Sequence, residues 1–190
     1  MLMVASPILR PLHLRWGATS AEVTAPMPGD DLVPGAQFSA TRAITIDAPP
    51  EDVWPWIQQV GFRRGGFYSY DLLDNLGRAS STVLLPEWQQ LGVGEIAAPM
   101  ADPPASATSF TIVESEAPTR LVWSKPDSTW AWTLEPVEGG RTRLVTRLKV
   151  RYRLRPDAFV TVPLMEFGDF AMMRRMLLGL RDRAERGTTP

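Results

Sequence analysis

The sequence predicts an α+β fold in which a curved antiparallel sheet of about six to seven strands wraps around a long C-terminal helix. Three observations support this prediction. One strand is followed by two short helices, a series of segments with the two-residue alternation of strands comes next, and a long segment with helical spacing of its apolar residues ends the chain. A sheet with one apolar face and a helix with one apolar stripe are buried most simply against each other.

The first strand and the two short helices are expected in the first half of the chain. Residues 37–46 alternate loosely between apolar and polar side chains. The Asp-Ala-Pro-Pro sequence at 47–50 is a typical helix start, so a helix is expected over residues 50–60. Ser69 is expected to cap a second, short helix that runs to about Leu76.

The later strands are separated by turns or loops that contain proline or glycine. They are expected at residues 94–98, 109–116, 120–124, 129–137 and 141–154. The final helix runs to Arg186 and presents, at helical spacing, Phe170, Met173, Met176, Leu177, Leu180 and Ala184. Residues 1–35 have no sustained period and are expected to form an extended N-terminal arm, whereas residues 36–187 are expected to form a single domain.

The composition excludes several classes of chemistry. The 190 residues include no cysteine and one histidine, His13. A disulfide framework, a thiolate nucleophile and a metal site built from Cys or several His are therefore excluded, and no metal or cofactor is expected. His13 lies in a segment interrupted by prolines, which is a poor place to hold an imidazole rigidly for a serine triad. The sequence also lacks the motifs of nucleotide, calcium and serine hydrolase sites.

The N-terminal segment predicts neither a transmembrane segment nor a signal peptide. Residues 1–9 are apolar, but Pro7 interrupts them and they are far shorter than the ~20 residues that a membrane span needs. No charged region and no cleavage site accompany them. A cytoplasmic protein is therefore expected.

Positive charge is concentrated in the last quarter of the chain. Residues 1–140 carry 8 basic and 16 acidic side chains, whereas residues 141–190 carry 12 and 5. Between Arg141 and Arg153 the basic residues take odd positions, which is typical of a strand with one solvated face. Nucleic acid is not an expected partner, because no aromatic residue is interleaved on this face to stack a base. A binding module that uses the basic face remains a third alternative.

The last strand pair allows two registers. A three-residue loop at 138–140 places Trp130 opposite Leu148 and Trp132 opposite Thr146, with both tryptophans on the apolar face. A two-residue glycine turn would instead turn both rings to the outer, basic face, where they could form cation–π contacts. The first register is favoured because it buries the apolar residues of both strands together.

Several segments resemble one known superfamily. Residues 41–61 (TRAITIDAPPEDVWPWIQQVG) look like the first strand and first helix of the START-like superfamily, which includes the polyketide cyclase/dehydrase and lipid-transport proteins and the birch-pollen-allergen fold. Residues 129–150 (TWAWTLEPVEGGRTRLVTRLKV) look like its last two strands. The N-terminal arm, GGFYSYDLLDNL and FAMMRRMLLGLRDRAE resemble a subgroup of bacterial, largely actinobacterial, members. The resemblance spans about residues 16–186 and implies a helix-grip fold.

The resemblance also implies an internal cavity between the sheet and the long helix. The protein is therefore expected to bind a small hydrophobic or amphipathic molecule, such as a lipid, polyketide or isoprenoid, as a carrier or sensor. For each candidate residue the alternative is that it fills a solid core. The candidate ligand-binding residues are Arg64, Tyr68, Trp88, Trp123, Trp130, Trp132, Thr146, Leu148, Phe167, Phe170 and Met173.

An enzyme of the polyketide cyclase or dehydratase type, acting on a reactive chain held in the same cavity, is the alternative function. The densest polar cluster near the expected cavity mouth contains Tyr70 and Asp71, which are the first candidates for a catalytic proton-transfer pair. The competing interpretation is that Asp71 faces the helix dipole and Asp74 faces solvent. Whether the N-terminal arm covers the cavity or mediates a homodimer stays open.

Overall fold

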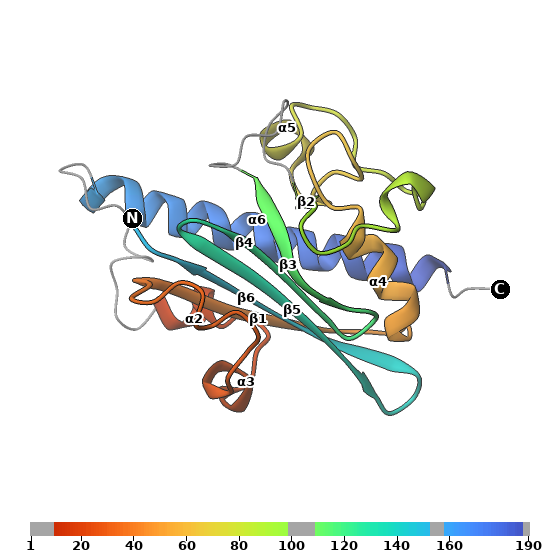
Figure 1. Cartoon of the computed structure of the whole chain (residues 1–190), viewed down its shortest axis with the longest axis horizontal. Coiled ribbons are helices and arrows are strands. Elements are labelled where there is room, and N and C mark those ends of the chain that lie inside the picture. Colours follow the sequence, from red (N-terminus) through yellow and green to blue (C-terminus); the bar gives the residue numbers. More distant parts are fainter. Residues whose placement is uncertain (1–9, 99–108, 153–157, 188–190) are drawn as a thin grey trace.

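The computed structural model describes residues 10–98, 109–152 and 158–187, which form a six-stranded antiparallel sheet with a long helix along one face (Figure 1). The strand order is β1-β6-β5-β4-β3-β2. This arrangement confirms the predicted α+β, helix-grip architecture. The strands are β1 (Phe38–Ile46), β2 (Ile96–Ala97), β3 (Phe110–Glu116), β4 (Arg120–Lys125), β5 (Ser128–Val137) and β6 (Arg141–Val150).

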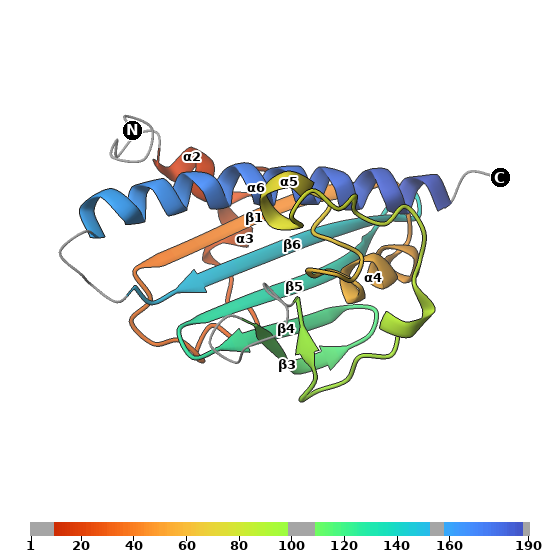
Figure 2. The same ribbon diagram turned by 90° about the horizontal axis from the view of Figure 1, so that it is seen from above.

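The C-terminal helix α6 (Ala158–Gly187) runs across the sheet (Figure 2). Five of the six side chains that were expected to share one face are buried, among them Met176, Leu177 and Leu180, whereas Phe170 is partly exposed. This burial confirms the prediction from helical spacing. None of the helices in the described part of the chain is long and apolar enough to cross a membrane.

Helix α4 (Pro50–Gln58) lies beside α6 near one end of the sheet (Figure 2). Pro50 is at the first helical position, where the missing N–H has no partner to lose, and Glu51 and Asp52 complement the positive end of the helix dipole. The helix ends at Gln58, two residues earlier than predicted. Helix α5 (Asp71–Asp74) and the 3-10 helix η1 (Pro86–Trp88) follow in the connection to β2.

The β5–β6 hairpin adopts the register with a three-residue loop. Trp130 pairs with Leu148 and Trp132 pairs with Thr146, as predicted. Gly139 and Gly140 in the loop have φ angles of 81° and 70°, in the left-handed region that favours glycine. The alternative register, with both tryptophans on the outer face, is wrong.

Two strands are shorter than predicted, and one predicted loop is not described. Strand β2 has only two residues, Ile96 and Ala97, instead of the predicted 94–98. Strand β6 ends at Val150, and the end of its predicted range, 153–154, lies outside the described residues, as does the whole of the predicted loop at 99–107.

The N-terminal arm covers the outer face of the sheet beside β1 and β6. It forms two short helices, α2 (Arg10–Leu14) and α3 (Ser20–Thr24), where an extended chain was expected. Thr19 and Glu22 form a capping box at the start of α3, which satisfies backbone N–H groups of a helix too short to be stable alone.

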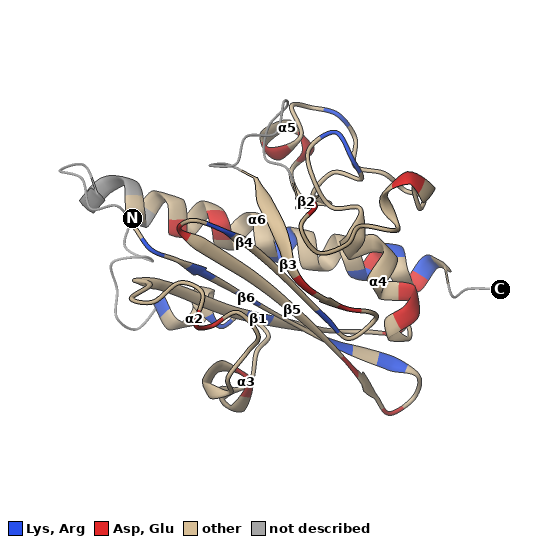
Figure 3. Cartoon of the chain, in the orientation of Figure 1, with Lys and Arg blue, Asp and Glu red and all other residues tan. Residues whose placement is uncertain are grey.

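The prediction that the basic side chains of β6 are solvated is wrong for the middle of the strand, from Arg143 to Lys149, whereas Arg141 is exposed as predicted. Lys and Arg recur along β6 (Figure 3), but the arm pairs with them. Nε of Arg143 is 2.7 Å from Glu22 Oε1, and the guanidinium of Arg147 is 2.7 Å from Asp30 Oδ2. Arg147 is only 6% exposed. The alternating basic residues of β6 therefore indicate a face of the sheet that is covered by acidic residues distant in sequence.

The arm also meets the edge of strand β1. The backbone N–H of Ala43 donates to the carbonyl of Trp16, at 3.1 Å. Gly17 follows with a φ of +73°, and a Cβ atom at this residue would lie 2.0 Å from the Ala43 carbonyl oxygen. Only glycine therefore permits this close approach.

Candidate ligand-binding site

A cavity of about 400 Å³ lies between the inner face of the sheet and helix α6. Strands β3, β5 and β6 supply one wall, helix α6 the opposite wall, and the segment around α5 a third side. Eight of the twelve described lining residues have apolar side chains. The lining consists of Phe67, Ser69, Asp74, Phe110, Trp130, Leu148, Met165, Gly168, Asp169, Met172, Met173 and Met176.

The polar hydrogens of the lining are already engaged with the protein. Trp130 Nε1 donates to the hydroxyl of Thr146 at 3.0 Å, and this hydroxyl donates to the carbonyl of Ala131. The hydroxyl of Ser69 donates to the carbonyl of Met172 at 3.0 Å. Ser69 therefore ties the α5 segment to α6 and does not cap α5, contrary to the prediction.

Asp74 brings an unpaired carboxyl group to the cavity. Neither of its carboxylate oxygens has a hydrogen-bond partner of acceptable geometry among the described residues. Burial, and then the nearby charge of Asp71, raise the pKa of Asp74 to about 6 from its ordinary value of 3.8, although the Ser69 hydroxyl and the backbone N–H groups of Tyr70 and Asp74 act in the opposite direction. Asp74 can therefore gain or lose a proton close to neutral pH.

Asp169 is the second carboxyl group of the cavity and is paired with a buried cation. Its Oδ2 lies 2.7 Å from a guanidinium nitrogen of Arg42, a residue of β1 that is 1% exposed. Burial raises the pKa of Asp169, while Arg42 lowers it. The positive charge of Arg42 balances this carboxylate when it is ionised.

A buried polar cluster continues from Asp169 toward the N-terminal arm. Arg42 Nε donates to the carbonyl of His13 at 3.0 Å. Arg10 donates two hydrogen bonds to Glu166, at 3.0 and 2.8 Å, and His13 Nε2 lies 3.7 Å from the same carboxylate. Burial lowers the pKa of His13. The imidazole is therefore buried in a helix, where the proline-interrupted segment predicted no rigid support, but neither ring nitrogen has a hydrogen-bond partner among the described residues.

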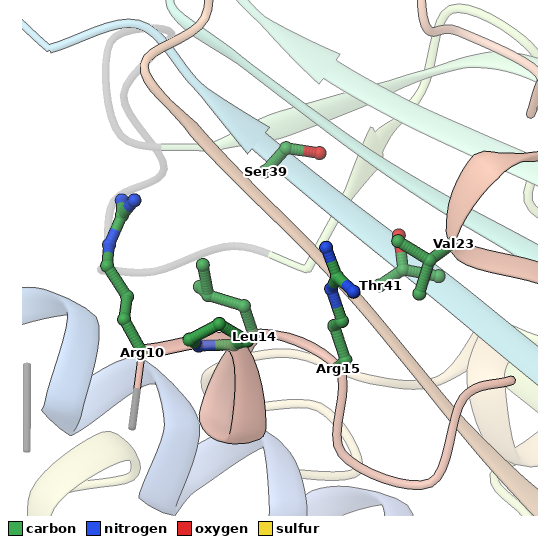
Figure 4. A pocket seen from close by; sticks show the side chains of 7 residues that line it. Arg10, Leu14, Arg15, Val23, Ser39 and Thr41 are labelled. Atoms are coloured by element: carbon green, nitrogen blue, oxygen red, sulfur yellow. The ribbon is translucent and has the colours of Figure 1, made fainter. Parts of the chain in front are cut away.

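A second, surface pocket of about 440 Å³ lies between α2, α3 and β1 (Figure 4). Arg10 and Arg15 flank Leu14 on one side, and Ser39 and Thr41 of β1 lie on the other. Its polar groups are partly engaged elsewhere, since Arg10 binds Glu166 and the Thr41 hydroxyl accepts from Arg147. The cavity between the sheet and α6 is therefore the stronger candidate site.

Comparison with known families agrees with this geometry. Residues 37–185 match the family described as polyketide cyclase/dehydrase and lipid transport. The chain belongs to this family. No curated protein matches the chain at a significant level.

Solved structures share the fold of this chain at low sequence identity. The crystal structure of SSP2350 from Staphylococcus saprophyticus is 16% identical, with a TM-score of 0.50 over 80% of this chain and 96% of the other. The solution structure of BH1534 from Bacillus halodurans is 14% identical, with a TM-score of 0.50 over 79% and 99%. At these identities the likeness concerns the fold alone.

Within the family fold, three candidate residues taken from the sequence line the cavity: Trp130, Leu148 and Met173. Thr146 lies directly behind the wall and orients the Trp130 ring through its hydrogen bond. Trp123 and Trp132 are 1% and 0% exposed and pack on Trp130, with ring centroids 5.2 and 5.0 Å away. These two rings support the wall from the core and are not among the described lining residues.

Two candidates on α6 face away from the cavity. Phe167 is 45% exposed, because it lies on the opposite side of the helix from Asp169, Met172 and Met173. The ring of Phe170 packs against the ring of His13, with centroids 5.9 Å apart. The guanidinium carbon of Arg42 lies over the Phe170 ring, 5.8 Å from its centroid. Phe170 therefore anchors the arm and is not among the residues found to line the cavity.

The candidates in the segments on either side of α5 are Arg64, Tyr68 and Trp88, and they lie apart from the described cavity lining. Arg64 stacks on the Trp88 ring at 4.2 Å, and burial lowers the pKa of Arg64. Tyr68 donates its hydroxyl to the carbonyl of Trp56 at 3.0 Å and lies under the guanidinium of Arg183, and burial raises its pKa. None of the three lines the described part of the cavity.

The proposed catalytic pair does not come together at the cavity. Tyr70 is 45% exposed. Asp71 accepts hydrogen bonds from the backbone N–H and the hydroxyl of Ser80, at 3.0 and 2.5 Å, and thereby fixes the loop that follows α5. Asp74, which was expected to face solvent, is the acid of α5 that lines the cavity.

Sequence reasoning missed Asp169, Arg42 and Met165 of the cavity and its surroundings. A signal for Asp169 was available, since it shares a helical face with Met165, Met172 and Met176 and is the only acid on that stripe. Arg42 likewise stands at an inward position of β1, in register with Thr146 of β6. A charge at a core position is a mark of pairing or of function.

Proposed function

We propose that the protein binds a small hydrophobic or amphipathic molecule in the cavity between the sheet and helix α6, as a carrier or sensor. The observation that carries the proposal is a cavity of about 400 Å³ whose described walls are mostly apolar. A volume of this size lies within the usual range for small-molecule sites, and apolar walls with few polar groups are typical of them. The four methionines of α6 in the lining suit a flexible or irregular ligand.

A cavity-blocking variant tests this proposal. Gly168 lines the cavity, and a Cβ atom built on it meets no heavy atom within 4 Å, so the Cβ atom of Gly168→Phe needs no displacement of the backbone and we expect its ring to enter the cavity. Displacement of a fluorescent apolar dye by fatty alcohols and isoprenoids should occur with the natural chain and decrease at least about tenfold in the variant. Gly187→Phe, in open space at the end of α6, is the matched control. Equal dye binding by all three chains would refute the proposal.

A cyclase or dehydratase is the second candidate function, and the position of Asp74 favours it. A carboxyl group with a pKa of about 6 can act as a general base at neutral pH. It could remove a proton from a carbon between two carbonyl groups of a bound chain, and the resulting carbanion could attack a third carbonyl of the same chain. Turnover of a poly-carbonyl substrate that is lost in Asp74→Asn would support catalysis. Stoichiometric binding without turnover would support a carrier.

A further inference from the structure

The chemistry of the cavity walls constrains the polar end of the ligand, and this constraint rests on the proposed binding function. Among the described lining residues, the Trp130 N–H and the Ser69 O–H are used within the protein. The remaining polar side-chain groups are the carboxyl groups of Asp74 and Asp169. The described lining therefore offers acceptors to a ligand at neutral pH and has no free side-chain N–H donor.

The charges near the cavity are balanced except at one position. Arg42 pairs with Asp169, and Arg10 pairs with Glu166 behind it. Asp74 lies near a second carboxylate, Asp71, and its oxygens have no hydrogen-bond partner among the described residues. When Asp74 ionises, its charge lacks a paired cation in this part of the molecule, and a buried carboxylate is stable only when it is paired.

We propose that the cavity takes an amphipathic amine, with an apolar body against the methionines and aromatic rings and a protonated amino group hydrogen-bonded to Asp74. An ammonium group supplies both the donor and the charge that the lining lacks. The faces of Trp130, Phe67 and Phe110 also suit a cation, since aromatic rings attract ammonium groups. A carboxylate ligand such as a fatty acid would instead bring a second negative charge toward Asp74.

Three probes that differ only in their polar end test the inference. Decylamine, 1-decanol and decanoate are titrated against the full chain at pH 7.5, below their aggregation concentrations. The amine should bind about tenfold more tightly than the alcohol, as a charged hydrogen bond implies, and decanoate should bind most weakly. In Asp74→Asn the amine and the alcohol should bind within about twofold of each other, while the affinity for the alcohol stays unchanged. Asp52→Asn, an exposed acid on α4, removes the same charge without this effect.

The outcomes separate the ligand class from the binding function. If none of the probes binds, or if Gly168→Phe leaves their binding unchanged, the proposed function itself fails. If 1-decanol binds and Gly168→Phe abolishes its binding, but the amine is no tighter or decanoate is tightest, only the amine inference is overturned. An amine preference that survives in Asp74→Asn overturns the assignment of Asp74 as its partner.

Discussion

At Asp74 the chain holds a carboxyl group in a position where an amide would be more stable. Its oxygens are buried beside apolar side chains, and no described residue pairs with them. Such groups persist in proteins where a ligand or a reaction uses them, because stability alone selects against them. The residue is therefore the most informative single position of the cavity.

Replacing Asp74 by asparagine should stabilise the free protein, and more so at high pH. The folded-state pKa of about 6 lies above the ordinary 3.8, so the folded state is favoured below pH 3.8 and loses this advantage as the pH rises through about 6. We expect a gain of about 1–2 kcal/mol for Asp74→Asn at pH 8, after allowance for partial solvent screening, and almost none at pH 4. Urea unfolding at the two pH values measures it. A loss of stability at pH 8 would contradict the description of Asp74 as unpaired.

At the scale of elements, the sequence correctly predicted the features that depend on residues close together in the chain. The β5–β6 hairpin and the buried stripe of α6 follow from alternation and spacing that can be read within one segment. The N-terminal arm was not predictable in the same way. Its place on the sheet depends on Glu22 and Asp30 meeting arginines more than 100 residues away, and no local pattern reports such a contact.

Arg147 is the residue that holds the arm most extensively. Its guanidinium donates to the Thr41 hydroxyl, to Asp30 and to the backbone carbonyls of residues 22, 23 and 25. Arg147→Ala should cost about 2–4 kcal/mol, since several buried acceptors lose their donor at once. Hydrogen exchange should accelerate in residues 19–33 before the rest of the chain. Arg141→Ala, at an exposed position of the same strand, is the control and should change little.

The ion pair between the arm and β6 should also shape acid stability. The Arg143 guanidinium, followed by the backbone N–H of Thr19, holds the pKa of Glu22 near 2, below its ordinary 4.5. A lowered carboxyl pKa stabilises the folded state above pH 4.5, and this contribution is lost as the pH falls toward 2. Glu22→Gln should therefore cost about 1–2 kcal/mol at pH 6 and little at pH 2.5. Thermal unfolding across this range is the measurement, and a pH-independent difference would assign the effect to the capping box alone.

For the molecule as a whole, the position of the cavity was predictable, but its chemistry was only partly so. Trp130, Leu148 and Met173 were found because inward positions on strands and helices can be counted from the sequence. The positions of the acidic residues relative to the cavity were predicted less well. Tyr70 and Asp71 were chosen because polar residues are dense there, yet a helix as short as α5 turns neighbouring residues in different directions, and only Asp74 reaches the cavity.

The contact of Gly17 with strand β1 can be tested with two glycines that share a backbone conformation. Gly17 and Gly35 have φ angles of +73° and +71°, but a Cβ atom meets Ala43 only at Gly17. Gly17→Ala should displace the arm from β1, whereas Gly35→Ala should add only the strain of an alanine in the left-handed region, about 1–2 kcal/mol. Light scattering at rising protein concentration should detect self-association in the first variant alone. Equal behaviour of the two variants would contradict this role of the arm.

The reason for expecting self-association lies in the two edge strands of the sheet, β1 and β2. A strand with free N–H and C=O groups along its edge is a template on which another chain can add. Strand β2 has two residues and offers little to such an addition, while β1 has nine and would be the weak side of the sheet. By crossing β1 near its middle, the arm breaks that edge into pieces too short to template a neighbour. We therefore expect the segment that neutralises the arginines of β6 also to protect the protein against aggregation.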